Sequence, residues 1–334
     1  MSVHLHHLTG DNSWLLTFRS DSSGSENHSK SLTFLLDPWF TEPDVQVHRL
    51  WLRQLHSTTK PPQFKDFRAL KGFLAAENRQ VDGIIITFNQ SDHLHKPTID
   101  GVDEEIPFFA FRRAARTLKQ WGRKHVYEIP REPNELRVCE GILEAEERAG
   151  RSSTRRDLID KLDIRLGFVP TTARLWKDPV QDLMHGSLVI MFSRGTWRGA
   201  IVYSPHGTPL KDMARWKKRK EKEMASDSDE SPNGILEVLA FMAGWDVARM
   251  PQLLGGTITF GTPKNARVTG LLSPRYWIRT HEELTLMSGF VSAILKRDVW
   301  SKDKVEGEIQ GHRTKVLEMD PGETLTIAMT EDSA

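Results

Sequence analysis

The chain has 334 residues, of which 38% are hydrophobic and 27% charged, a composition typical of a globular protein in water. Its net charge of +1 with neutral histidines gives no electrostatic reason to expect nucleic acid or an anionic membrane as a partner. The single cysteine, Cys139, excludes an internal disulfide framework and a cysteine-rich zinc site, so any metal would have to be held by histidines and carboxylates.

The predicted elements alternate between strands and helices along the chain. Apolar or alternating runs predict strands at 14–18, 31–37, 83–88, 107–111, 125–130, 187–193, 199–204 and 275–280. Helical spacing, or an apolar run taken as a buried helix, predicts helices at 67–78, 112–122, 235–245 and 281–297. This alternation favours a layered α/β (or α+β) architecture in which helices cover the faces of sheets.

We expect a single domain over residues 1–334. The Ser-rich segment 19–31 is typical of a long connection between two strands, and the basic-then-acidic segment 213–234 of a charged flexible insertion. No stretch is apolar enough over a sufficient length to span a bilayer, and the first residues lack the pattern of a secretory signal. We therefore expect a cytoplasmic protein with no membrane partner.

Several predicted strands end in the same way, with a histidine or an aspartate. Asp37 closes the strand at 31–37, Asp92 and His93 follow 83–88, His206 follows 199–204, and His281 follows 275–280. In layered α/β folds, ligands and metals bind in the crevice at the carboxyl ends of strands. The pattern therefore predicts one shared site, with His185, just before the strand at 187–193, as a further candidate.

Each of these residues also has a simpler interpretation. Ser91 or Asp92 could cap a helix that begins near His93. His206 lies in the turn-like sequence SPHG, His281 could open its own helix, and His185 could be satisfied by backbone hydrogen bonds. The residues alone leave these alternatives open. The histidines of HLHH (4–7) would alternate across the faces of a first strand, which makes them poor candidates for a common ligand set.

The order of motifs resembles the metallo-β-lactamase superfamily over most of the chain. HHLTGDNSWLLTF followed by LLDPWF resembles the first strands of that family, and GIIITFNQSDHLH lies where the family has its His-x-His-x-Asp-His signature. IVYSPHG and PRYWIRTHEE resemble the later strand with a bridging Asp and the final metal-binding His. The motifs SDHLHKPT, YSPHG and WIRTHEE resemble those of a branch of the superfamily that has a degenerate metal-binding motif and is common in fungi and plants. The resemblance implies a four-layer αββα sandwich.

The resemblance also implies which ligands remain. The first two signature histidines fall on Phe88 and Gln90, and neither is a suitable zinc ligand, so the family's first metal site is expected to be lost even though His185 resembles its third histidine. The second site is kept as Asp92, His93 and His281, with His206 in the bridging position. We therefore expect one metal ion per chain, zinc or alternatively manganese or iron.

The roles of two further residues follow from the same resemblance. Asp37 would orient a ligand imidazole through its other ring nitrogen. Asp92 and His95 would be the catalytic candidates, with His95 at the rim or acting as a proton shuttle.

Two functions from different classes fit this sequence. The first is a metal-dependent hydrolase that acts on a small-molecule ester, lactone, amide or phosphoester. The second is a catalytically inactive scaffold of the same fold that binds a ligand or protein partner in the cleft where the family has its active site. Phe88 and Gln90 favour this second function. A third alternative is that the histidines are structural and that no metal binds. No basic stripe with interleaved aromatic residues supports nucleic acid as a substrate.

Overall fold

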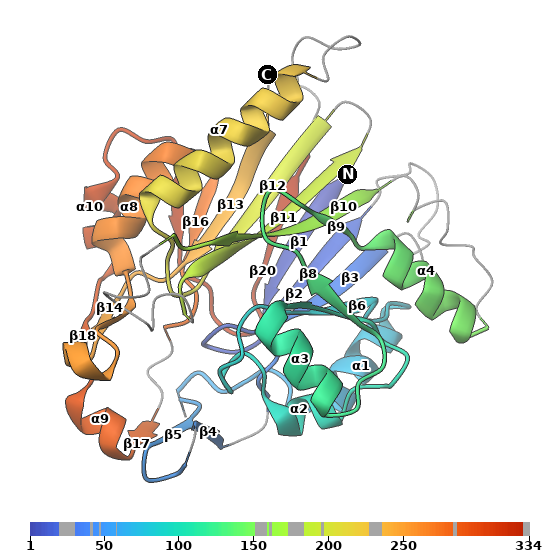
Figure 1. The fold of residues 1–334 in the computed structure, drawn as a ribbon, viewed down its shortest axis with the longest axis horizontal. Helices are drawn as coiled ribbons and strands as arrows, with labels where there is room; N and C mark the ends of the chain where they lie inside the picture. The colour runs from blue at the N-terminus through green and yellow to red at the C-terminus, as the bar shows by residue number, and fades with distance from the viewer. Residues whose placement is uncertain are drawn as a thin grey trace.

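Two large β-sheets packed face to face form the centre of the molecule, and helices lie on both outer faces (Figure 1). The computed structural model describes residues 1–19, 31–40, 43–46, 48–57, 59–150, 159, 162–172, 184–194, 197–226, 236–282 and 286–329. The predicted connection at 19–31 falls almost entirely on residues 20–30, which lie outside the described residues.

The first sheet has mixed strand directions. Its strands, in spatial order, are β20 (Thr324–Ala328), β1 (Ser2–His7), β2 (Trp14–Arg19), β3 (Ser31–Leu36), β6 (Gly83–Ile86), β7 (Phe108–Phe111) and β8 (Val126–Ile129). From β3 to β8 the neighbouring strands are parallel, so their carboxyl ends meet at one edge of the sheet.

The second sheet repeats this arrangement. Its strands, in spatial order, are β19 (Lys315–Leu317), β16 (Tyr276–Ile278), β13 (Leu236–Ala243), β12 (Trp197–Ser204), β11 (Gly186–Arg194), β10 (Asp163–Pro170) and β9 (Leu136–Arg137). The strands β12, β13, β16 and β19 are parallel, which brings the segments after them to a common edge.

Two small sheets lie beside this edge. One contains β15 (Thr257–Thr259), β14 (Val247–Arg249) and β18 (Lys296–Asp298), and the other contains β17 (Leu286–Ser288), β5 (Leu52–Leu55) and β4 (Asp44–Gln46). The helical segments of the described chain are α1 (Phe67–Ala76), α2 (Lys96–Asp100), α3 (Arg112–Gln120), α4 (Cys139–Arg148), α7 (Leu210–Ser226), η1 (Gln252–Leu254), α8 (Gly261–Leu272), α9 (Phe290–Ile294) and α10 (Lys302–Glu308).

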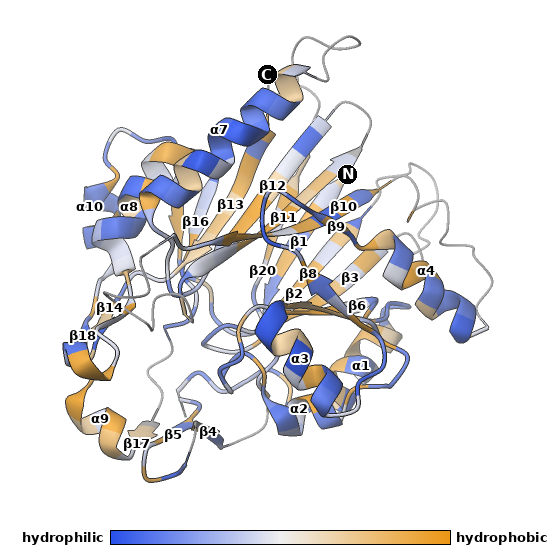
Figure 2. Ribbon diagram, in the orientation of Figure 1, coloured by the Kyte–Doolittle hydropathy of each residue, from blue (hydrophilic) through white to orange (hydrophobic). Residues whose placement is uncertain are grey.

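Three hydrophobic clusters account for the layers. The central cluster joins the inner faces of the two sheets, for example through Phe18 of β2 and Phe192 of β11, whose rings meet edge to face at 5.0 Å. A second cluster packs α1 and α3 on the outer face of the first sheet, and a third packs α7, α8 and α10 on that of the second. The αββα order implied by the resemblance is therefore confirmed, and Figure 2 shows the apolar strands inside these layers.

Two predicted helices are wrong. Residues 235–245 contain the strand β13, which lies inside the second sheet with a parallel neighbour on each side. A strand buried on both faces is apolar throughout, so its sequence cannot be told from that of a buried helix by periodicity. Residues 281–297 contain β17, α9 and the start of β18, and Gly289 between the first two has a φ of 100°, which a continuous helix does not allow.

The charged segment 213–234 begins inside α7. Met213 and Trp216 of this helix are fully buried against the second sheet, while its other side is strongly polar (Figure 2). Residues 227–235 lie outside the described residues. None of the helices in the described part of the chain combines the length and the apolar composition that crossing a membrane requires.

Candidate metal centre

Three histidines from different parts of the chain meet where the two sheets expose their carboxyl-end edges. The Nε2 atoms of His93 and His206 lie 3.0 Å apart, and the ring of His281 lies 4.5 Å from that of His206 and 5.0 Å from that of His93. One ring nitrogen from each residue lies within 4.8 Å of the other two. Two imidazole nitrogens bound to one tetrahedral zinc ion are about 3.3 Å apart, so the spacing suits a common cation.

A buried carboxylate fixes the orientation of His93. Asp37 Oδ2 lies 2.8 Å from Nδ1 of His93, and the Asp37 oxygens also accept hydrogen bonds from the backbone N and the hydroxyl of Thr87 at 2.8 and 2.5 Å. Because this carboxylate only accepts hydrogen bonds, Nδ1 of His93 is the donor. Nε2 therefore presents a lone pair to the cluster, as a metal ligand does.

A second carboxylate, Asp11, plays the same part for His281. Its oxygens lie 3.1 and 3.2 Å from Nδ1 of His281, and its backbone carbonyl accepts the backbone N–H of the same residue at 2.9 Å. Burial by itself lowers the pKa of His281, but the charge and hydrogen bond of Asp11, followed by the charge of Asp92, outweigh it and raise this pKa to about 9. The site is thus built to attract positive charge to the position of His281.

His206 and Asp92 each have a buried polar atom without a hydrogen-bond partner among the described residues. Burial, followed by the neighbouring histidines His281, His93 and His185, holds the pKa of His206 well below its usual value, so its imidazole is neutral. Within the described part of the chain, His206 Nδ1 and Asp92 Oδ1 have no hydrogen-bond partner, although both are buried. Unsatisfied buried polar atoms are rare in folded proteins. A cation bound to Asp92 Oδ1 would explain why this oxygen has no hydrogen-bond partner within the residues that the structure describes.

The acidic side of the cluster forms a second candidate ligand group. Asp11, Asp92 and His281 each have a ligand atom within 4.8 Å of the other two, and Asp92 Oδ2 lies 3.8 Å from Nε2 of His281. Neutral imidazoles together with carboxylates form a donor set that suits zinc, manganese or iron. The residues present therefore fit a divalent cation.

The backbone conformation of two residues in the cluster is also typical of a functional site. Asp37 and His281 have positive φ angles of 42° and 61°, which few non-glycine residues adopt. Backbone in this region costs free energy and is frequent at functional sites, where the surrounding structure holds it in place.

The alternative in which Ser91 or Asp92 caps a helix that begins near His93 is wrong. Helix α2 begins at Lys96, its N-cap is His95, and residues 91–93 form a turn. The side chain of Asp92 is thereby left to face the cluster, and the backbone carbonyl of Asp92 accepts a hydrogen bond from the amide of Asn12 at 2.9 Å.

Phe88 occupies the space beside His93 and His206. Its ring centre lies 5.2 Å from that of His93 and 5.1 Å from that of His206, and Phe88 is buried. His185 is also buried but stacks on Phe260 at 4.0 Å, and it does not belong to either ligand group found among the described residues. Its role as a ligand stays a prediction.

His95 lies away from the three histidines. Its Nδ1 contacts the hydroxyl of Thr98 at 3.0 Å, its Nε2 contacts the carbonyl of Pro43 at 3.4 Å, and burial lowers its pKa to about 4. A neutral imidazole held by these contacts is a weak candidate for a proton shuttle near pH 7. This role also stays a prediction.

A cavity of about 270 Å³ opens beside the cluster and gives a small molecule access to it. Asp11, Asp92, His206 and His281 lie on its wall, and most of the remaining lining is apolar. Much of the apolar lining lies in or next to the small sheets and α9, and includes Trp51, Leu52, Met250, Ile258, Met287 and Val291. Small-molecule sites typically combine an apolar wall with a few convergent polar groups in this way.

Comparison with known proteins identifies the fold. No family model matches the sequence, and no curated protein matches it. Among solved structures, it is similar to Igni18, a novel metallo hydrolase from the archaeon Ignicoccus hospitalis, with 13% identity, a TM-score of 0.53, and 99% of this chain and 100% of that chain covered.

The chain is similar to two further solved structures. The isothiocyanate hydrolase from Delia radicum gut bacteria is 13% identical, with a TM-score of 0.55 and coverage of 96% of this chain and 98% of that chain. A protein described as a possible metal-dependent hydrolase from Veillonella parvula is 16% identical, with a TM-score of 0.52 and coverage of 98% and 100%. These three structures therefore show that the fold is of the metallo-β-lactamase type.

Asp11 and Asn12 are the site residues that the sequence patterns missed. They follow β1 in a loop, and Asp11 meets His281 across a separation of 270 residues. The Gly-Asp-Asn turn between two strands was the available signal, but such turns are common and carry no chemistry by themselves.

Proposed function

We propose that this protein is a metal-dependent hydrolase that holds one divalent cation with His93, His206 and His281, and with Asp92 as a carboxylate donor. The observation that carries the proposal is the pair of buried carboxylates, Asp37 and Asp11, that turn the Nε2 atoms of two histidines toward a common point. Zinc is the cation that this donor set suits best, with manganese or iron as alternatives.

The substrate in this proposal is a small ester, lactone, amide or phosphoester that enters through the cavity beside Asp92 and His281. A divalent cation at this place supplies Lewis-acid polarisation of a carbonyl or phosphoryl oxygen and lowers the pKa of water. Asp92 has two carboxylate oxygens, so one of them can bind the cation while the other orients a water molecule or accepts its proton. Asp11 accepts the Nδ1–H of His281, which would leave Nε2 of His281 free to bind the cation.

We also propose a branch of the superfamily and a cellular location for this protein. The motifs SDHLHKPT, YSPHG and WIRTHEE support the branch with a degenerate metal-binding motif. The single cysteine is consistent with a cytoplasmic location, where disulfides are rare.

An alternative is a catalytically inactive scaffold that binds a ligand in the same cavity. Phe88 favours it, because its ring fills the side of the cluster where the family resemblance implies two further histidine ligands. A cluster that binds a single cation without turning over a substrate would be its signature.

A reconstitution assay separates the two candidates. The protein, purified without a histidine tag, is stripped with a chelator, reloaded with zinc, manganese or iron(II), and tested with p-nitrophenyl acetate, a γ-lactone, an anilide and bis-p-nitrophenyl phosphate. We expect at least tenfold more turnover of one substrate after reloading, and its loss in His206→Ala but not in His312→Ala, which alters an exposed histidine. Bound metal without turnover of any substrate class would favour the scaffold.

A further inference from the structure

A separate pocket of about 130 Å³ lies at the carboxyl ends of β6, β7 and β8, and Phe88, whose ring contacts those of His93 and His206, is among the residues that line it. The residues that follow these three parallel strands line it, together with Phe168 of β10. This edge is the position at which parallel sheets bind ligands. None of the metal-ligand candidates lines this pocket.

The pocket carries more positive than negative charge. Three arginines line it, Arg112, Arg113 and Arg131, against one acid, Glu128. Glu128 lies 3.8 Å from Arg112, whereas Arg113 and Arg131 have neither a hydrogen bond nor an ion pair from their side chains within the described residues. Two guanidinium groups are therefore available to an anion.

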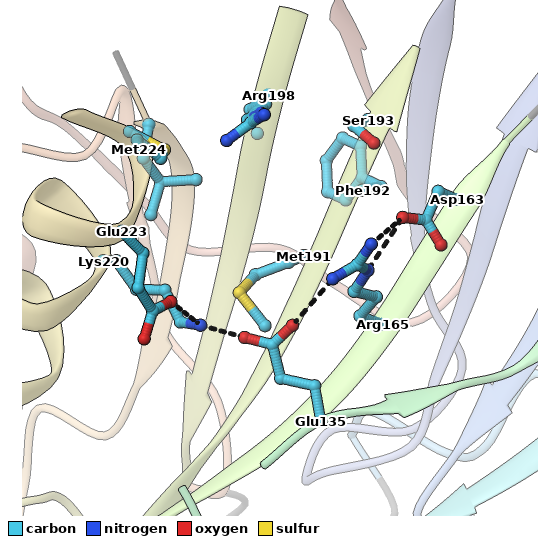
Figure 3. A pocket seen from close by; sticks show the side chains of 12 residues that line it. Glu135, Asp163, Arg165, Met191, Phe192, Ser193, Arg198, Lys220, Glu223 and Met224 are labelled. Carbon is cyan, nitrogen blue, oxygen red and sulfur yellow. Dashed lines mark hydrogen bonds and ion pairs between the residues drawn. The ribbon is translucent and has the colours of Figure 1, made fainter. Parts of the chain in front are cut away.

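The larger pocket between α7 and the second sheet shows the contrast (Figure 3). There, Lys220 contacts Glu135 and Glu223, and Arg165 contacts Glu135 and Asp163. These charges neutralise one another inside the pocket, so it offers little to a charged ligand.

Helix α3 adds to the positive potential at the arginine pocket. Arg112 and Arg113 are its first two residues, its first turn contains no acid, and its N-cap residue, Phe111, provides no side-chain hydrogen bond. Cations at the amino end of a helix oppose the helix dipole, while an anion there is stabilised by it. A bound anion would offset both the positive charge of the arginines and the positive end of the helix dipole.

The floor of the pocket is aromatic. The ring centres of Phe111 and Phe168 are 4.0 Å apart, and the ring of Phe88 meets that of Phe111 edge to face at 5.6 Å. A ligand that satisfies both parts of the pocket needs a flat apolar body and an anionic group that guanidinium can bind in a bidentate manner.

We infer that this pocket binds a small aromatic or similarly flat organic carboxylate, with Arg113 and Arg131 holding the carboxylate and Phe111 and Phe168 packing against the body. Phe88 contacts both this floor and the histidines, so the pocket and the candidate metal centre share this side chain. The inference does not depend on hydrolysis.

The test is a calorimetric titration of the full chain with 2-naphthoate, its uncharged isostere 2-naphthamide, and inorganic phosphate. We expect one 2-naphthoate per chain, with 2-naphthamide and phosphate each binding at least tenfold more weakly. Arg113→Gln and Arg131→Gln should each weaken 2-naphthoate binding about tenfold. Arg116→Gln is the matched control, because Arg116 is exposed on the same helix and does not line the pocket.

Equal binding of 2-naphthoate and 2-naphthamide, or unchanged binding in both arginine variants, would overturn the inference. Repeating the titration in Asp92→Ala separates it from the proposed function. Unchanged binding there is expected, because Asp92 lies in the other cavity, whereas binding lost with Asp92 would assign the ligand to that cavity and also refute the inference.

Discussion

Replacing Asp37 by asparagine tests the orientation of His93 without changing the shape of the site. Asparagine is nearly isosteric and tolerates the positive φ of 42° at this position. If its oxygen still accepts the backbone N–H of Thr87, its NH₂ group replaces Oδ2 and faces Nδ1 of His93. His93 must then take the other tautomer, with a proton on Nε2.

This change should weaken metal binding substantially. A protonated Nε2 cannot bind a cation, so the site must either lose one of its ligands or break the new hydrogen bond. Removing the partners that orient metal ligands typically weakens affinity 10- to 100-fold. We therefore expect a loss of about 1.4 to 2.7 kcal/mol of binding free energy.

The assay is competition for zinc against a chromogenic chelator, with circular dichroism to verify the fold. Thr87→Val is the matched control, because it removes a hydroxyl that donates to the same Asp37 oxygen at 2.5 Å but leaves the carboxylate and the tautomer of His93 intact. We expect less than a threefold effect from it. Equal zinc affinity in Asp37→Asn and the wild type, or an equally large loss in Thr87→Val, would refute the reasoning.

Three further predictions concern the rest of the fold and site. Changing Phe88 and Gln90 together to histidine should raise zinc content toward two ions per chain in elemental analysis, and no gain would show that the geometry of the family's first site is gone. Trp216→Ala should cost about 3 to 5 kcal/mol in urea unfolding, because this fully buried side chain packs α7 on the sheet; a cost below 1 kcal/mol would show that the helix is dispensable. Burial lowers the pKa of His7 to about 4, so stability is lost as the pH falls below the unfolded value near 6.5. Between pH 7.5 and 5, wild type should lose about 2 kcal/mol more than His7→Gln in urea unfolding, and equal losses would contradict this.

The sequence predicted the strand ends well because the signal there is local. An apolar run followed at once by His or Asp, as in 83–93 and 199–206, places the polar side chain at the edge of a sheet, and parallel pairing brings such edges together. The structure gathers Asp37, Asp92, His93, His206 and His281 at one place, as this pattern predicted.

The errors arose where local pattern and tertiary context disagree. The segment 235–245 is apolar on all sides because β13 is an interior strand, and only its neighbours in the sheet distinguish it from a helix. Asp11 could not be found at all from spacing, because its partner His281 is nearly the whole chain away. The arginine pocket was missed for a similar reason, since Arg113 and Arg131 come together only when β7 and β8 pair.

The metal content of the protein, measured by elemental analysis after purification without a histidine tag, tests the central claim most directly. We predict about one zinc, manganese or iron ion per chain, lost in Asp92→Ala and in His281→Ala while the circular dichroism spectrum stays unchanged. No metal in the wild type, even after reconstitution at neutral pH, or metal retained in both variants, would contradict the proposed centre.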